Sequence, residues 1–361
     1  MIRFIIKRLM YGILVLIGVV MLVFFLFDLT RIDPARLTLG QRADVESIEK
    51  VRKRLGLDLD IGSRFLLYLN DVSPISIHNH KNPESPSYLD DQEYDYSKVF
   101  SAGNKTLVFK VPYLRRSYQS GKSVTELLLE RVPSTMILAV TAMLIATIIG
   151  ILIGVIAAVK PNSAIDRACI AGSVLGISSP SFFSGIVFQL VFAVMLGGLT
   201  GFNISGGLFV VDPYTGKEYL ELKNLVLPAV VLGIRPIAVI SQLTRSSMLD
   251  ILSMDYVRTA KAKGLNKRKV IFKHALRNAL NPVVTSVSGW LAGLFAGSFF
   301  VESIYNFNGL GSTTVDALKT FDFPVVMGAV LFIAFMFVMI NILVDIVYGI
   351  LDPRIRSKAT H

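Results

Sequence analysis

Six long apolar runs, separated by polar segments, dominate the pattern of hydrophobic and polar positions along the chain. The hydrocarbon core of a bilayer is about 30 Å thick, so a helix needs about 20 apolar residues to cross it. The runs therefore predict six membrane-spanning helices, at residues 9–29, 136–159, 181–199, 225–249, 283–301 and 325–350. No small-residue cleavage site follows the first run, so we expect an anchor helix and not a removable signal peptide.

The third apolar run is longer than one span requires. It covers residues 168–199 and is interrupted at Pro180, within "GISSPSFFSG". Because proline removes a backbone donor, either one kinked helix or two half-helices is expected. A single crossing places Lys160 and Arg167 on the same side of the membrane as the basic segment 255–282, which the positive-inside rule favours.

The charge balance supports a membrane protein with cytoplasmic ends. The 361 residues are 53% hydrophobic and 17% charged, with a net charge of +11 and a mean hydropathy of +0.59. In such a chain, cations beside spans are topology signals before they indicate nucleic acid, and no nucleic-acid partner is expected. Both termini are predicted to be cytoplasmic because both carry cations: Arg3, Lys7, Arg8, Arg354, Arg356 and Lys358.

The polar region at residues 30–131 is longer than a connector needs and predicts an external subdomain. Its first part, "DVESIEKVRKRLGL", predicts an amphipathic helix that stops at Gly56. Its last part, "SVTELLLERVP", predicts a helix that begins with the capping-box spacing of Ser123 and Glu126 and stops at Pro133. The stretch between them, "SPISIHNHKNPESPSYLDDQEYDYSKVF", is expected to be an ordered loop.

No complete catalytic or metal-binding motif is found, so no catalytic residue and no metal ligand is predicted. The sequence "GKS" at residues 121–123 resembles the end of a phosphate-binding loop, but Arg116 stands where that motif requires glycine. Cys169 is the single cysteine, and the four histidines lack the spacing of ligands. Any ATP is therefore expected to be bound by another chain.

The run "DYVRTAKAKGLNKRKVIFKHALRNALNP" is the most polar segment of the C-terminal half. It predicts a helix over residues 255–263, a stop at Gly264, and a second helix that Pro282 separates from the fifth span. Three roles are compatible with it: a connector that sets topology, a nucleic-acid contact, or a docking element for a cytosolic partner. A connector can be shorter, and a DNA reader tethered between two spans is an unusual design, which favours docking.

This segment closely resembles the cytoplasmic loop of permease subunits of dipeptide/oligopeptide/nickel ABC importers. The resemblance extends over most of the chain and includes "RFIIKRLMYGILVLIGV", "DPA" at residues 33–35, "VRKRLGLD", "LLERVPSTMILA", "GISSPSFF", "LPAVVLG", "QLTRSSMLDIL", "FVESIYNFNGLG" and "DPRIR". It implies an all-α integral membrane protein with the type I ABC importer fold, which is not itself an enzyme, in the bacterial inner membrane. Residues 72–111 form an insert without a recognised counterpart, and the family often has an aromatic residue at Asn306 or Asn308.

The domain organisation predicted on this basis has three parts. Residues 1–30 form the N-terminal anchor helix, and residues 31–131 form the periplasmic subdomain that contains the insert. Residues 132–361 form the permease core, with a cytoplasmic coupling loop at residues 250–282.

The resemblance implies that the loop is a coupling helix seated in a groove of an ATPase subunit. Aligned on Gly264, Arg258, Thr259 and Ala260 occupy the positions of the Glu-Ala-Ala motif of bacterial importers, and only the last alanine and the glycine match. Ala260 and Ala262 are expected to allow close approach, and the cations to meet acidic residues of the partner. The predicted coupling residues are Asp255, Tyr256, Val257, Arg258, Thr259, Ala260, Lys261, Ala262, Lys263 and Gly264.

The same resemblance implies several partners. The protein partners are a second permease subunit in a heterodimer, two cytosolic ATPase subunits that hold ATP and Mg, and an external solute-binding protein. The expected solute is a short peptide. Membrane lipid surrounds the spans, and no cofactor is expected in this chain. Nickel complexes and glutathione remain alternative solutes. Two other classes stay open: a membrane scaffold, and a stand-alone secondary carrier, which is disfavoured because Asp28, Glu302 and Asp345 lie near predicted span ends.

Candidates for the translocation path are polar residues within the spans. Arg235 lies about 15 Å into the fourth span, where a charge is costly unless it faces water or a partner. It is expected either to attract a peptide carboxylate or to pair with carbonyls or a carboxylate of a neighbouring subunit, and Gln242 and Ser181 are further path candidates. In the fifth span, glycine occurs three times at a spacing of four residues, which favours helix packing over pore lining. These residues are Gly289, Gly293 and Gly297.

Overall fold

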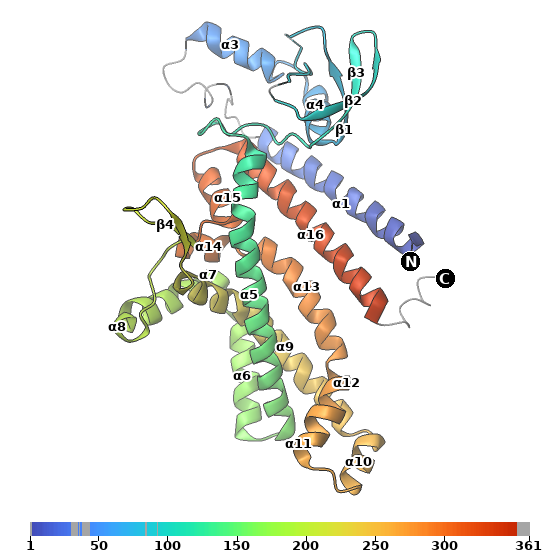
Figure 1. Ribbon diagram of the computed structural model, residues 1–361, viewed down its shortest axis with the longest axis vertical. Helices are drawn as coiled ribbons and strands as arrows, with labels where there is room; N and C mark the ends of the chain where they lie inside the picture. The colour runs from blue at the N-terminus through green and yellow to red at the C-terminus, as the bar shows by residue number, and fades with distance from the viewer. Residues whose placement is uncertain are drawn as a thin grey trace. The chain divides into compact units, whose positions relative to one another are not determined.

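The computed structural model is mostly helical and describes residues 2–29, 35, 37, 44–83, 85–91 and 93–351 (Figure 1). The chain forms two compact units, one made of Met1–Glu130 and Thr314–Phe335 and the other of Arg131–Thr313 and Met336–His361. Asp33, Pro34, the motif "DPRIR" and the cations of the C-terminal tail lie outside the described residues.

The described helices account for four to six membrane spans. Four are long and apolar enough to cross a bilayer: α1 (Ile2–Asp28), α5 (Val124–Val159), α9 (Lys223–Leu252) and α16 (Phe323–Leu351). Two bent pairs raise the number to six if each is one span. The first pair is α6 (Ala164–Ser178) with α7 (Ser181–Phe188) and the π-helical segment η1 (Gln189–Met195), and the second is α13 (Asn281–Gly297) with α14 (Phe299–Tyr305). The predicted all-α membrane fold is confirmed.

The break in the third apolar run occurs at Pro180. The two arms of this pair are bent by 109°, and Pro180 itself has an extended backbone at the start of α7. Of the two alternatives for this run, the two half-helices are the ones observed. The predicted start of the third span, at residue 181, is too late, because the apolar residues before Pro180 already form α6.

Between α1 and α5, the first unit combines two helices with a small sheet. The helices are α3 (Val45–Arg54) and α4 (Ile61–Val72), and α3 ends just before Gly56, whose φ is +68°, as predicted. The strands β1 (Ile75–Asn79), β2 (Tyr96–Ala102) and β3 (Lys105–Lys110) form an antiparallel sheet of order β1-β3-β2. A two-residue turn joins β2 to β3, with Gly103 at a φ of +63°.

The prediction of an ordered loop for the stretch at residues 73–100 is therefore wrong at its two ends, which belong to β1 and β2, while the described residues between these strands form turns and irregular structure. The strands of the sheet carry an unusual pattern, because the face that packs inside the unit is largely polar. Ser76, His78 and Lys110 are buried, whereas Ile75 and Phe109, which pair across β1 and β3, are more than half exposed. Strands are normally recognised by apolar residues on the buried face, so this inversion conceals them in the sequence.

The buried polar face is organised around Asp71, at the end of α4. The Arg115 guanidinium contacts its carboxylate with Nη2–Oδ2 and Nε–Oδ2 distances of 3.0 and 3.1 Å, and the Tyr94 hydroxyl donates to the same carboxylate at 3.2 Å. Lys110 is 2% exposed, donates to the Asp71 carbonyl and lies over the Tyr94 ring. Burial lowers the pKa of Lys110 to about 8, although the charge of Asp71 acts in the opposite direction.

We expect the stability of this sheet region to rise between pH 8 and pH 9.5. The unfolded chain, with a lysine pKa near 10.5, binds more protons than the folded chain in this window, so raising the pH favours folding by about 1.5 kcal/mol. Above pH 10 the buried tyrosines oppose this gain, because burial raises the pKa of Tyr68 and Tyr94 and only the unfolded chain ionises. The measurement is the urea midpoint for resistance to a short proteolysis pulse at each pH. Lys110→Met should remove the increase, and an unchanged increase in that variant would assign it to another group.

In the second unit, glycines on α5 bring α9 close. A Cβ atom at Gly154 would lie 2.5 Å from the Thr244 Cβ atom, and one at Gly150 would lie 2.8 Å from Ile240 Cγ2. Such small residues allow close helix packing in a membrane.

The prediction that a helix stops at Pro133 is wrong, because α5 runs through it without a break. In an apolar environment unpaired backbone groups are costly, so a helix tends to continue past a proline.

Candidate functional site

The helix α10 (Asp255–Ala262) is attached to the end of α9 by its inner face. Val257 is fully buried and Ala260 is 7% exposed, and both pack against Val270 and the partly buried Leu265. The chain turns sharply at Gly264, which has a φ of +77°, and the Leu265 N–H donates to the Ala260 carbonyl at 3.3 Å. The predicted stop at Gly264 is confirmed at the level of the backbone.

The second helical part of the segment leads from α10 to the span that begins with α13. It consists of α11 (Lys267–Lys269), the π-helical η2 (Val270–Leu276) and α12 (Arg277–Ala279), and Pro282 lies in the first turn of α13. Ile271 and Ala275 belong to one apolar cluster with Val155, near the end of α5, and Met248, near the end of α9. The two-helix segment is therefore fixed to the ends of both helices, at one end of this unit (Figure 1).

The outer surface of the two-helix segment is strongly basic. Asp255 is the only carboxylate between residues 255 and 301 of the sequence, and its contact with Arg258 is long, at 3.7 Å, and highly exposed. Such a pair contributes little to stability. The exposed cations are Arg258, Lys261, Lys263, Lys267, Arg268, Lys269, Lys273 and Arg277. The surface is complementary in charge to an acidic partner.

The structure separates the ten predicted coupling residues into two groups. Val257 and Ala260 face the chain itself, so Ala260 anchors α10 and does not provide the close approach expected of it. The Tyr256 hydroxyl accepts a hydrogen bond from Asn278 Nδ2 at 2.8 Å. The exposed group comprises Asp255, Tyr256, Arg258, Thr259, Lys261, Ala262, Lys263 and Gly264.

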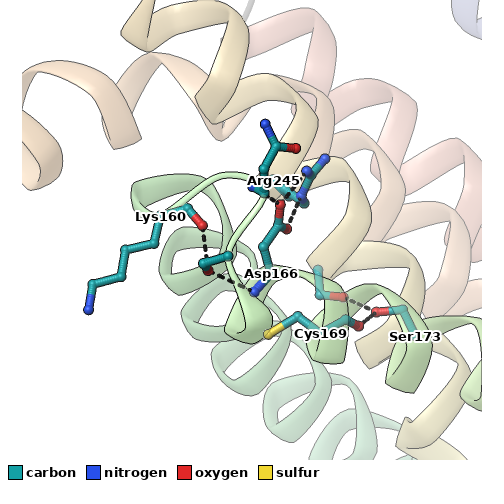
Figure 2. A network of polar contacts seen from close by, with 8 residues as sticks. Lys160, Asp166, Cys169, Ser173 and Arg245 are labelled. Carbon is teal, nitrogen blue, oxygen red and sulfur yellow. Dashed lines mark hydrogen bonds and ion pairs between the residues drawn. The ribbon is translucent and has the colours of Figure 1, made fainter.

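An ion pair between the partly buried Arg245 and the buried Asp166 joins α9 to α6 (Figure 2). Arg245 holds Asp166 with two contacts, of 2.5 Å (Nε–Oδ1) and 2.7 Å (Nη2–Oδ2), and the Asn162 N–H donates to Oδ2 at 2.8 Å. Ser163 caps α6 through a hydrogen bond from the Asp166 N–H. The spacing of Ser163 and Asp166 is a helix-start signal that the sequence offers, but the pairing with Arg245 depends on a contact between residues 79 positions apart.

A cavity of about 90 Å³ lies beside the break at Pro180. It brings together two of the three predicted path residues, Arg235 of α9 and Ser181 of α7. Its other polar residues are Ser179 and Ser184, and Gly293 and Trp290 of α13 also line it. Gln242 does not line this cavity and is exposed two turns further along the same face of α9.

Arg235 is exposed on α9, and none of the described residues forms an ion pair or a hydrogen bond with its side chain. The predicted packing glycines show a similar lack of neighbours within this chain. A Cβ atom at Gly289 or Gly293 would meet no described atom within 4 Å, and the surroundings of Gly297 lie outside what the structure describes.

Glu302 lies near the end of the bent pair α13–α14, as expected, and is fully buried in a polar cluster. Its carboxylate accepts hydrogen bonds from Thr135 Oγ1 at 2.8 Å, the Gly311 N–H at 2.7 Å and the Ser312 N–H at 3.1 Å. These N–H groups belong to the first turn of α15 (Leu310–Lys319), where a negative charge is favourable.

Asn306 ends α14 in the left-handed conformation, which asparagine adopts more readily than an aromatic residue.

Comparisons with known proteins agree on one family. The family model described as the binding-protein-dependent transport system inner membrane component matches residues 150–357, and the model of its N-terminal region matches residues 1–87. The chain is 34% identical over 372 residues to the di/tripeptide transport system permease protein DppB of Pseudomonas aeruginosa, covering 99% of this chain and 100% of the relative.

Two further relatives show the same similarity with the same coverage. The chain is 34% identical over 376 residues to the dipeptide transport system permease protein DppB of Escherichia coli K12, and 34% identical over 358 residues to the glutathione transport system permease protein GsiC of Salmonella choleraesuis. In both cases, 99% of this chain and 100% of the relative are covered.

Proposed function

We start from the fact that the chain belongs to the family of binding-protein-dependent transport system inner membrane components, and we propose that it is the subunit that couples ATP hydrolysis to passage of a short peptide. It is a multi-pass permease subunit of an ABC importer of the peptide branch. The relatives named for dipeptides support a short peptide as solute. The chain itself carries out no chemical step in this proposal.

The remaining parts of the importer are proposed as separate chains. A second permease forms the path together with this one, an external binding protein delivers the solute, and two ATPase subunits hold ATP and Mg. ATP binding closes the ATPase dimer, draws the coupling helices together and turns the path outward, and hydrolysis resets it. Such coupling requires the ATPase dimer to bind two permease states with different affinity.

The single observation that carries this proposal is the two-sided construction of α10. Its inner face, Val257 and Ala260, is packed on the chain, and its outer face is exposed and cationic. A push on the outer face reaches α5 and α9 through the contacts of Ile271 and Ala275. These contacts support the proposal that the segment receives a partner and transmits its movement.

The same arrangement supports a cytoplasmic position for the coupling segment. Both termini are proposed to be cytoplasmic as well, because cations flank the first and last spans in the sequence. Lys160 follows the last residue of α5 directly, and Arg167 lies in the first turns of α6. They therefore share one end of the second unit with the cations of the segment 255–282 (Figure 1). Clustering of cations at one end is typical of the cytoplasmic side.

The path and the contact with the second permease are assigned to exposed faces of α7, α9 and α13. Arg235, Gln242 and Ser181 are proposed to line the path. Gly289, Gly293 and Gly297 are proposed to pack against the second permease, since at the first two a Cβ atom would meet no described atom of this chain.

The test is co-purification from the native membrane after replacing residues 258–264 with a neutral linker of equal length. We expect the wild-type chain to bring down a second permease and ATPase subunits, and the variant to lose the ATPase subunits alone. The matched control replaces residues 212–217, the exposed turn between β4 (Phe209–Val211) and β5 (Glu218–Leu220), and should keep every partner. A wild-type chain that comes down alone and still transports would favour a stand-alone carrier.

A second candidate solute is glutathione, because a glutathione permease is as similar to this chain as the dipeptide permeases are. Competition separates the two. If an unlabelled dipeptide suppresses uptake of a labelled dipeptide and an equal concentration of glutathione does not, the peptide assignment holds, and the reverse result assigns glutathione.

A further inference from the structure

The side chain of Arg235, in the middle of the membrane-spanning helix α9, has no partner among the described residues. Arg235 lies about 18 Å from the start of α9 and about 25 Å from its end, at 1.5 Å per residue. A charge at this depth is costly unless it faces water, a ligand or another subunit. The described residues provide it with neither an ion pair nor a hydrogen bond, while its side chain is exposed.

The cavity beside Arg235 has the composition of a small anion subsite. Three serines from the break between α6 and α7 line it, namely Ser179, Ser181 and Ser184, and no carboxylate lies among the described residues around it. Hydroxyl groups donate hydrogen bonds, and a guanidinium offers a planar pair of donors that matches a carboxylate. The residues of the cavity therefore favour a carboxylate over a cation.

The size of the cavity restricts what part of a solute it holds. A volume of about 90 Å³ corresponds to roughly three water molecules. This is enough for a carboxylate and its first neighbours, and too little for a whole dipeptide. The remainder of the solute would extend toward the exposed face of α9, on which Gln242 lies.

We propose that Arg235 and the serines at the Pro180 break form a subsite for the C-terminal carboxylate of the transported peptide. The proposal rests on the proposed function, since it names the part of the solute that the path recognises. The guanidinium binds the carboxylate with two hydrogen bonds, and the hydroxyl of Ser181 adds a third. No covalent step is involved.

The experiment measures uptake by the complete importer in proteoliposomes, with dialanine and dialanine amide as solutes. Arg235→Gln is expected to raise the KM for dialanine by about 10- to 100-fold, the range of a charge-assisted pair, and that for the amide by less than about twofold. Arg235→Lys keeps the charge but loses the planar pair of donors. Its KM for dialanine should therefore lie between those of the wild type and Arg235→Gln. Lys223→Gln is the matched control, because it removes an exposed cation from the first residue of the same helix.

If the binding protein itself discriminates against the amide, uptake alone does not report on the subsite. Labelling of a thiol at position 235 then tests the subsite directly. In a Cys169→Ser background, which removes the single native cysteine, Arg235→Cys provides one thiol. We expect dialanine to slow its reaction with a small water-soluble thiol reagent, and the amide to have no effect. Reaction with a reagent that leaves a cation should restore part of the uptake of dialanine, whereas one that leaves a neutral group should not.

The outcomes separate this inference from the proposed function. If Arg235→Gln lowers uptake of both solutes equally, or if neither solute protects the thiol, the carboxylate subsite is wrong while peptide import stands. Loss of the second permease on co-purification with Arg235→Gln would assign Arg235 to a pair between subunits and also overturn the subsite. If the wild-type importer takes up neither peptide, the proposed function fails.

Discussion

Gly264→Val is expected to reduce ATP-driven uptake by roughly tenfold or more while the chain still inserts into the membrane. Gly264 has a φ of +77°, where a residue with a Cβ atom is strained by about 1–2 kcal/mol and a β-branched one by more. A Cβ atom there would meet none of the described atoms within 4 Å, so the cost lies in the backbone and not in a clash. Relief of the strain turns α10 away from the following helix and misplaces its cationic surface.

The measurements are uptake and ATP hydrolysis in the same proteoliposomes. We expect hydrolysis to continue while losing its dependence on solute, because the proposed function assigns the ATPase sites to separate chains. Gly264→Asn should retain most of the uptake, since asparagine tolerates the left-handed conformation. Gly103→Val provides a strain control at a φ of +63° in the turn between β2 and β3, far along the chain from the coupling segment. Normal uptake with Gly264→Val, or an equal loss with Gly103→Val, would contradict a coupling role for this turn.

The features that the sequence predicted correctly depend on local rules. The spans follow from runs of about 20 apolar residues, and the stops at Gly56 and Gly264 follow from the freedom of glycine to adopt a positive φ. The break at Pro180 likewise follows from one residue that cannot donate a backbone hydrogen bond.

The features that the sequence did not reveal depend on contacts between distant residues. The pair Asp166–Arg245 joins positions 79 apart, and the bond from Thr135 to Glu302 joins positions 167 apart. No local pattern indicates that such groups meet. The three-stranded sheet was missed for another reason, because its buried face carries Ser76, His78 and Lys110 where apolar residues are expected.

The candidate site shows the same division. The sequence predicted a helix that begins at Asp255 and a stop at Gly264, and the structure has both of these features. Which residues of α10 face outward depends on how the helix packs against Val270 and Leu265. Ala260 was therefore assigned to the partner although it belongs to the inner face.

The buried cluster around Glu302 gives the largest expected effect on stability. Glu302→Ala removes the acceptor of two backbone N–H groups, of Gly311 and Ser312, and of the Thr135 hydroxyl, all of which are buried. Each buried polar group left without a partner costs about 1–3 kcal/mol, so the free energy of unfolding should fall by roughly 3–6 kcal/mol. For a chain of this size the midpoint of thermal aggregation in detergent should fall by roughly 5–15 °C.

Two variants show whether this loss comes from the hydrogen bonds of the cluster. Thr135→Val keeps the volume but removes one donor to Glu302 and the acceptor of the Leu310 N–H, so its effect should be about one third to one half of that of Glu302→Ala. Glu218→Ala removes an exposed carboxylate from β5 in the same unit and should leave the midpoint within about 1 °C. If Glu302→Ala were as stable as Glu218→Ala, the first turn of α15 would be held by other contacts. Because the cluster fixes the turn that contains Asn306, its loss should also disorder the "FVESIYNFNGLG" segment, which protease cleavage within residues 306–312 would reveal.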